Sequence, residues 1–221
     1  MKNLKAVLFD LDGTLIDSEY FYFSNWQPIL SQEFNFTIDF GDWIEHFAGH
    51  TLVDNVRLLK EKWGIDTTEE FMWTETRANY AKSDMRTIRL MPYAAEILAY
   101  LQRQDIRMGL VTSSYQTTVD TVLGHHGLLS YFEFFVTRER VIKPKPHPEP
   151  YRLGIQSLGL ATDQILALED TSTGVAAAKG AGLSCFAVTK HATERAKLTM
   201  ADRLFFDLNE VIQAFEHDAL G

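Results

Sequence analysis

Two aspartates, Asp10 and Asp12, follow directly after a short apolar run at Lys5–Phe9. The run predicts a buried strand, and residues two apart on an extended chain lie on the same side of it. An Asp-Gly pair such as Asp12 with Gly13 is typical of a turn, but a turn does not account for Asp10. Two carboxylates on one side can act as a nucleophile with an acid or base, or can bind a hard cation. The end of this strand is therefore the candidate site.

Short apolar runs alternate with helical patterns over most of the chain. Several runs have consecutive apolar residues, which is typical of strands buried on both faces of a parallel sheet. The predicted strands are Lys5–Phe9, Arg107–Val111, Phe132–Val136, Ile165–Leu168, Ser184–Val188 and Arg203–Phe206. The predicted helices between them are Pro92–Gln104, Tyr115–His126, Pro148–Leu158, Thr173–Ala181 and Leu208–Phe215. This alternation predicts an α/β fold with a Rossmann-like parallel sheet and helices on both faces.

One region breaks the alternation, because it contains only amphipathic helical patterns such as Leu52–Trp63 and Thr68–Lys82. All the tryptophans of the chain lie in it. They are Trp26, Trp43, Trp63 and Trp73. Aromatic residues at helical positions are typical of the core of a small bundle, and we expect that role for them.

We accordingly place a helical cap domain at residues 17–87, inserted into a core formed by residues 1–16 and 88–221. A cap of this kind can open and close over a site and exclude water from it. The hinges are expected where the chain crosses between the two domains, near Ile16–Ser18 and Asp84–Leu90.

Composition excludes several classes of protein. The 221 residues carry a net charge of −9, whereas binding to nucleic acid requires clustered Lys and Arg. The apolar run Leu4–Phe9 is too short for a signal peptide, and no run has the length of a membrane helix. Cys185 is the only cysteine, so no intramolecular disulfide can form. We expect a cytoplasmic protein that binds neither nucleic acid nor membrane. The sequence leaves its oligomeric state open and is compatible with a monomer.

The run FDLDGT at residues 9–14 resembles the Asp-x-Asp-Gly-Thr signature of the haloacid dehalogenase superfamily. That family's other motifs occur in order, as Val111–Ser114 after the second core strand, Lys145–Glu149 before a helix and Leu168–Thr171 after another strand. The helical insert lies where the family's first class of cap is found, and the resemblance spans nearly the whole chain. It is similar to the group of β-phosphoglucomutase and phosphoglycolate phosphatase. The resemblance implies a phosphatase that acts on a small phosphorylated metabolite.

The resemblance also assigns roles in phosphoryl transfer. Asp10 would be the nucleophile and form an aspartyl-phosphate, while Asp12 would protonate the leaving oxygen and later activate water. Thr112, the backbone N–H of Ser113 and the ammonium of Lys145 would bind the transferring phosphoryl group.

An anionic nucleophile approaches an anionic phosphate only if the charge is neutralised, and Mg²⁺ is the usual partner of phosphate oxygens. The resemblance implies that Asp10, the backbone carbonyl of Asp12 and Asp170 bind it, with Glu169 behind them. As an isolated pair, Glu169 and Asp170 would only stabilise the start of a helix. Because they follow an apolar strand at the place of the family's last motif, a role in metal binding is favoured over that role.

Several other residues near these motifs can have either a functional or a purely structural role. Lys143 repeats the Lys-Pro dipeptide but lies out of register with the family's Lys-Pro-x-Pro pattern, so a solvated neighbour is expected. Ser114 can bind an anion or cap the helix predicted after it. Thr14 can position the second aspartate or satisfy the turn. Gly49 and His50 resemble a cap loop that meets substrate in this family.

The main alternative is a sugar phosphomutase similar to β-phosphoglucomutase. Such enzymes supply cations for a second phosphate, whereas the corresponding positions here are Leu52 and Tyr115. They also carry a histidine at the position of Tyr22, and it keeps the general acid withdrawn until a sugar binds. A phospho-signalling receiver module is disfavoured by the chain length and the position of the acidic pair. A silent binding protein is disfavoured because every acid–base and metal residue is present.

Overall fold

The computed structural model describes residues 3–48, 50–190 and 192–219. It divides into two compact units, one made of Met1–Asp17 with Arg89–Gly221 and the other of Ser18–Ile88. Each boundary lies one residue beyond the predicted one. The first unit is the core and the second is the cap, and each is described by itself.

The core is built on a six-stranded sheet in the order β5-β4-β1-β6-β7-β8, with every described pair of neighbours parallel. The strands are β1 (Ala6–Phe9), β4 (Arg107–Val111), β5 (Phe135–Val136), β6 (Ile165–Glu169), β7 (Ser184–Val188) and β8 (Arg203–Phe205). All residues of β1 and β6 are buried, which explains their consecutive apolar residues. The predicted α/β class with a Rossmann-like parallel sheet is confirmed.

The strand predicted at Phe132–Val136 is shorter in the structure, where β5 contains only Phe135 and Val136. The preceding residues still run along β4, since the N–H of Glu133 donates to the carbonyl of Met108 over 2.9 Å and the carbonyl of Phe134 accepts from the N–H of Leu110 over 3.1 Å. The strand lies at the edge of the sheet, where pairing on one side alone supports a short segment.

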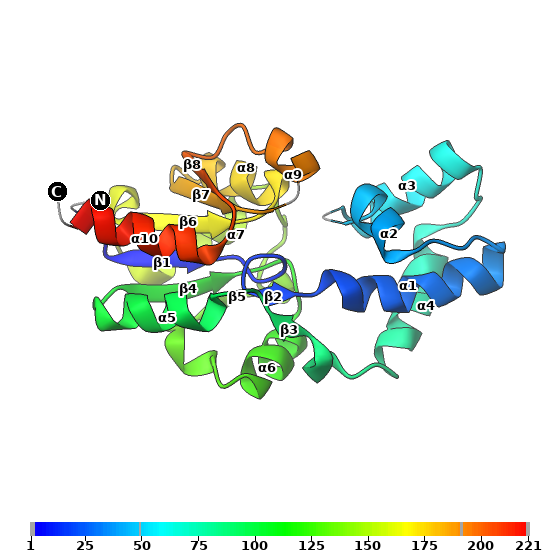
Figure 1. The fold of residues 1–221 in the computed structure, drawn as a ribbon, viewed down its shortest axis with the longest axis horizontal. Helices are drawn as coiled ribbons and strands as arrows, with labels where there is room; N and C mark the ends of the chain where they lie inside the picture. The colour runs from blue at the N-terminus through cyan, green and yellow to red at the C-terminus, as the bar shows by residue number, and fades with distance from the viewer. Residues whose placement is uncertain (1–2, 49, 191, 220–221) are drawn as a thin grey trace. The chain divides into compact units, whose positions relative to one another are not determined.

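Helices cover both faces of this sheet (Figure 1). They are α5 (Ala94–Arg103), α6 (Gln116–His125), α7 (Glu149–Leu158), α8 (Ser172–Gly180), α9 (Ala192–Lys197) and α10 (Leu208–Ala219). Helix α5 contacts α10, and α7 contacts both α8 and strand β1. Gly154 lets α7 approach closely, since a Cβ there would lie 2.9 Å from Leu8. Five of the six helices lie where the sequence predicts them, and the short polar α9 was not predicted.

A two-stranded antiparallel ribbon joins the segments that lead to and from the cap. It pairs β2 (Ile16–Asp17) with β3 (Arg89–Leu90). Each strand has only two residues, which is too short to give a hydrophobic period, so the ribbon was not predicted. The ribbon ties the two chain crossings together within the core unit.

The described residues of the cap unit form helices joined by loops, with no strand among them, as predicted. Its helices are α1 (Glu19–Phe34), α2 (Phe40–His46), α3 (Leu52–Trp63) and α4 (Glu69–Tyr80). Short 3₁₀ turns occur at Met85–Thr87 here, and at Arg138–Arg140 and Thr162–Gln164 in the core.

Aromatic residues form the centre of the cap, with Trp26 and Trp43 buried and the rings of Trp63 and Phe47 stacked at 5.4 Å. The prediction that all the tryptophans share this core is wrong for Trp73. Its side chain is 48% exposed, and the guanidinium of Arg77 lies 4.6 Å from its ring centroid. Within the described residues of either unit, no helix combines the length and apolarity that crossing a membrane requires.

Candidate active site

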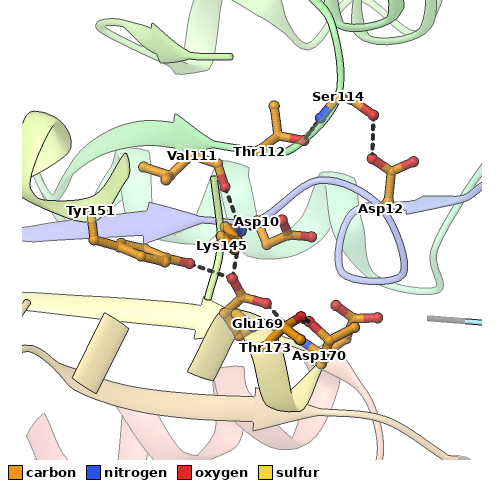
Figure 2. A network of polar contacts seen from close by, with 12 residues as sticks. Asp10, Asp12, Val111, Thr112, Ser114, Lys145, Tyr151, Glu169, Asp170 and Thr173 are labelled. Carbon is orange, nitrogen blue, oxygen red and sulfur yellow. Dashed lines mark hydrogen bonds and ion pairs between the residues drawn. The ribbon is translucent and has the colours of Figure 1, made fainter. Parts of the chain in front are cut away.

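The candidate site lies where three neighbouring strands end (Figure 2). Asp10 follows β1, Thr112 follows β4 and Asp170 follows β6, and these strands are adjacent in the order β4-β1-β6. The ladder continues past the strand ends, since the N–H of Asp10 donates to the carbonyl of Leu168 over 2.9 Å. Parallel pairing therefore brings together groups that are more than a hundred residues apart in the chain.

Lys145 links the first and last motifs. Its Nζ donates to Oδ1 of Asp10 over 2.6 Å, to Oε1 of Glu169 over 2.5 Å and to the carbonyl of Val111 over 2.9 Å. An ammonium has three donors, so all are used, and the side chain is only 6% exposed. Lys143 is exposed, and its backbone N–H donates to Glu149. The structure thus places Lys145, and not Lys143, against Asp10.

Burial and neighbouring charges shift the pKa values of Asp10 and Lys145. Burial raises the pKa of Asp10 well above its ordinary value, because the attraction of Lys145 offsets only part of the desolvation and because Glu169 and Asp12 repel its charge. Burial lowers the pKa of Lys145, but Asp10 and Glu169 outweigh it and leave that pKa above its ordinary value. The ammonium therefore stays charged, and it cannot neutralise the surrounding carboxylates alone.

Glu169 is fully buried and is held by donors from three directions. Besides Lys145, the hydroxyl of Tyr151 donates to its Oε1 over 2.6 Å and the N–H of Asp170 to its Oε2 over 3.3 Å. Burial and Glu169 raise the pKa of Tyr151 well above its ordinary value, so the phenol remains a donor. Tyr151 was not predicted as a site residue, and its only signal in the sequence is its place in the helix that follows the lysine motif.

The acidic residues fit a hard cation. Carboxylate oxygens of Asp10, Glu169 and Asp170 lie within 4.8 Å of one another, and the first two residues are buried. Gly13 makes room for the third, because a Cβ there would lie 2.0 Å from Oδ2 of Asp170. Grouped carboxylates with one ammonium among them are a donor set that suits Mg²⁺. The carboxylate of Asp12 is outside this group, which leaves its backbone carbonyl for the assigned role.

Thr112, Ser113 and Ser114 form the motif after β4, and its last residue contacts Asp12. Oγ1 of the buried Thr112 accepts from the N–H of Ser114 over 2.9 Å, so its own proton is available to a further acceptor. Ser113 is exposed between them. The hydroxyl of Ser114 donates to Oδ2 of Asp12 over 2.6 Å. Thr14 is buried, and within the described part of the chain its hydroxyl makes neither of the two contacts expected of it.

Of the two cap residues named from the sequence, the structure describes His50, which belongs to the cap unit. His50 is exposed in the cap unit, in the loop before α3, where its N–H donates to the carbonyl of Phe47 over 3.3 Å. Gly49 lies outside the described residues. Their role in substrate binding stays a prediction.

We expect Gly174→Ala to destabilise the protein by about 2 kcal/mol or more. A Cβ at Gly174 would lie 2.0 Å from Oε2 of Glu169, so the carboxylate would have to leave Lys145 and Tyr151. The matched control is Gly124→Ala in α6, where the nearest atom would be 3.4 Å away. The free energies of unfolding in urea measure the difference. Equal effects of the two changes would contradict the packing of Glu169 described above.

The geometry agrees with comparisons to known proteins. The family described as haloacid dehalogenase-like hydrolase matches residues 7–188, which include every candidate motif. The chain belongs to this family. Validoxylamine A 7'-phosphate phosphatase of Streptomyces hygroscopicus subsp. limoneus is 30% identical over 208 residues, which cover 94% of this chain and 95% of that protein. Pyrophosphatase PpaX of Oceanobacillus iheyensis is 26% identical over 212 residues, or 95% and 96% of the two chains.

A solved structure shares the fold of this chain. The crystal structure of CbbY from Rhodobacter sphaeroides in complex with phosphate superposes with a TM-score of 0.73 and is 25% identical. The superposition covers 91% of this chain and 93% of that one. The resemblance found in the sequence is confirmed, and the predicted enzyme class, a phosphatase of the haloacid dehalogenase superfamily, agrees with the names of the relatives.

Proposed function

We propose that this protein is a Mg²⁺-dependent phosphatase that hydrolyses a phosphomonoester of a small metabolite through an aspartyl-phosphate on Asp10. The observation that carries the proposal is the contact of Lys145 with both Asp10 and Glu169 at the end of β1. A buried carboxylate, fixed by an ammonium and crowded by other acids, is arranged as a nucleophile that needs a cation and a phosphate to balance its charge.

Oδ2 of Asp10 is the proposed attacking oxygen, because Oδ1 is the oxygen that accepts from Lys145. The ammonium orients the carboxylate and offsets the charge of an arriving phosphoryl group. Phosphate-ester hydrolysis is among the slowest uncatalysed reactions, and a covalent intermediate divides it into two easier transfers. Asp12 gives a proton to the leaving oxygen in the first transfer and takes one from water in the second.

Thr112 and Ser113 are the proposed donors to the transferring group, through a hydroxyl proton and a backbone N–H. Asp10, Asp170 and the carbonyl of Asp12 would hold Mg²⁺, with Glu169 behind them. When bound, the metal supplies positive charge to the phosphate oxygens and to the carboxylates around it. The protein's net charge of −9 makes this local charge necessary for an anionic substrate.

The substrate class is proposed from the site and its relatives together. One relative is named as a phosphatase of validoxylamine A 7'-phosphate and another as a pyrophosphatase, so family membership alone does not choose between an ester and an anhydride. We favour a sugar phosphate or a similar phosphomonoester. The test is a phosphate-release screen with Mg²⁺ over sugar and polyol phosphates, nucleotides, phosphoglycolate and pyrophosphate. Release from esters supports the proposal, and release from pyrophosphate alone would refute it.

A phosphomutase is the second candidate, and three positions argue against it. Leu52 and Tyr115 stand where β-phosphoglucomutase-like sequences carry cations, and Tyr115 is exposed as the N-cap residue of α6. Tyr22 stands where they carry a histidine, and its ring packs against that of Tyr80 at 6.1 Å between centroids. A phenol in this aromatic cluster cannot take the role of a titrating imidazole.

We therefore expect more hydrolysis than isomerisation when β-glucose 1-phosphate is offered with catalytic glucose 1,6-bisphosphate. Without a group that withdraws Asp12, water should reach the phosphoenzyme and release inorganic phosphate. The measurement follows glucose 6-phosphate and phosphate in the same reaction. Faster formation of glucose 6-phosphate would show that the enzyme is a mutase.

A further inference from the structure

Ser114 is fixed by three hydrogen bonds within the core unit, and one of them reaches Asp12 (Figure 2). Its N–H donates to Oγ1 of Thr112 over 2.9 Å, and its carbonyl accepts from the N–H of Arg138 over 2.9 Å. Its hydroxyl donates to Oδ2 of Asp12 over 2.6 Å, and both side chains are partly buried. Since both backbone groups are held, the hydroxyl presents its proton at a fixed place beside the first motif.

This hydroxyl does not cap the helix that follows it. Helix α6 begins at Gln116, and its N-cap residue is Tyr115, whose side chain makes no capping hydrogen bond. The N–H of Gln116 donates instead to a carboxylate oxygen of Glu139 over 3.0 Å. The contact of Ser114 with Asp12 spans 102 positions of the chain, so it is a tertiary contact and not a product of local geometry.

We propose that Ser114 is a positioning residue for Asp12, whose Oδ2 it holds so that Oδ1 carries the proton exchanged during catalysis. The inference rests on the proposed function, because it concerns the acid–base step of that reaction. Because Oδ2 accepts the hydrogen bond from Ser114, the inference assigns the exchange of the proton to Oδ1. A carboxyl held in one orientation has also already lost the freedom that it would lose in the transition state.

The two transfers use this proton in opposite directions. In the first, an oxygen of Asp10 bonds to phosphorus, the ester P–O bond breaks, and the proton on Oδ1 of Asp12 moves to the leaving oxygen. In the second, the oxygen of water bonds to phosphorus, the bond from phosphorus to Asp10 breaks, and a proton of water returns to Oδ1. Protonation matters most for a strongly basic leaving oxygen, as in an alkyl ester, and little for p-nitrophenolate.

The test compares kcat/KM for an alkyl phosphate, the best ester of the substrate screen, with kcat/KM for p-nitrophenyl phosphate at saturating Mg²⁺. Ser114→Ala should lower the value by about tenfold or more for the alkyl ester and by less than about threefold for the aryl ester. Ser114→Thr keeps the donor and should recover most of the loss. Ser114→Cys, with a weaker donor of similar size, should show a smaller loss of the same kind and replaces the alanine variant if that one does not fold.

An Asp12→Asn background separates positioning from other effects, because Ser114→Ala should cause no further ester-selective loss when the acid is absent. Equal losses on both esters, or a selective loss that persists in this background, would overturn the inference while leaving the proposed function intact. A wild-type protein that released phosphate from neither ester would overturn both.

Discussion

Asp10→Asn is expected to lower phosphate release by at least about 10³-fold while leaving the fold intact. The amide has nearly the same shape, and its oxygen can still accept from Lys145, but it cannot attack phosphorus. The change should also raise the temperature of unfolding in chelator at neutral pH. Because the pKa of Asp10 is raised in the folded protein, its ionised form opposes folding, and that cost grows as pH rises from the unfolded pKa to the folded one.

The matched control is Asp163→Asn, an exposed carboxylate just before the opposite end of β6. It should leave both activity and stability near those of the wild type. Circular dichroism checks the fold of both variants. Activity of Asp10→Asn within tenfold of the wild type would mean that another group is the nucleophile.

Removal of divalent metal is expected to abolish activity, with recovery in Mg²⁺ and poor recovery in Ca²⁺. Asp10, Glu169 and Asp170 gather their oxygens within 4.8 Å, and Lys145 is the ammonium in contact with two of them. Ca²⁺ takes more ligands in looser geometry, so it should misalign an in-line transfer. Asp170→Ala should raise the Mg²⁺ concentration for half-maximal activity by about tenfold or more.

A readout independent of activity accompanies this prediction. Mg²⁺ should raise the unfolding temperature of the wild type and of Asp163→Ala, and should do so much less for Asp170→Ala. Full activity in chelator would contradict the proposed metal site.

The parts of the fold that could be predicted are those with a strong hydrophobic period. Strands β1 and β6 are buried on both faces, so their runs are continuously apolar, and α3 has an amphipathic face over its whole length. The ribbon of β2 and β3 could not be predicted, because a strand of two residues carries no hydrophobic period and because its pairing joins Ile16 with Leu90 and Asp17 with Arg89, which are far apart in the chain. The edge strand β5 was overestimated because apolar residues that pack in a turn resemble a strand.

The site residues that could be predicted are those that come directly after a strand. Asp10, Thr112 and Asp170 come together because β4, β1 and β6 are neighbours, which a parallel α/β sheet places at one edge. The contacts of Tyr151 and Ser114 were not predictable, since each reaches a carboxylate through tertiary packing. Residue type alone gave Ser114 two ordinary roles; the structure excludes helix capping, because the N-cap residue of α6 is Tyr115, and anion binding stays a prediction.

Chemical identification of the phosphorylated residue tests the proposed aspartyl-phosphate mechanism most directly. Asp12→Asn should hydrolyse its phosphoenzyme slowly, because water is no longer deprotonated, and p-nitrophenyl phosphate should still form it, because that leaving group needs no acid. Quenching this reaction and reducing it with borohydride converts an acyl phosphate to the alcohol, which peptide mass spectrometry locates. We expect homoserine at position 10. Reduction at another acidic residue, or release of p-nitrophenol with no modified residue, would contradict it.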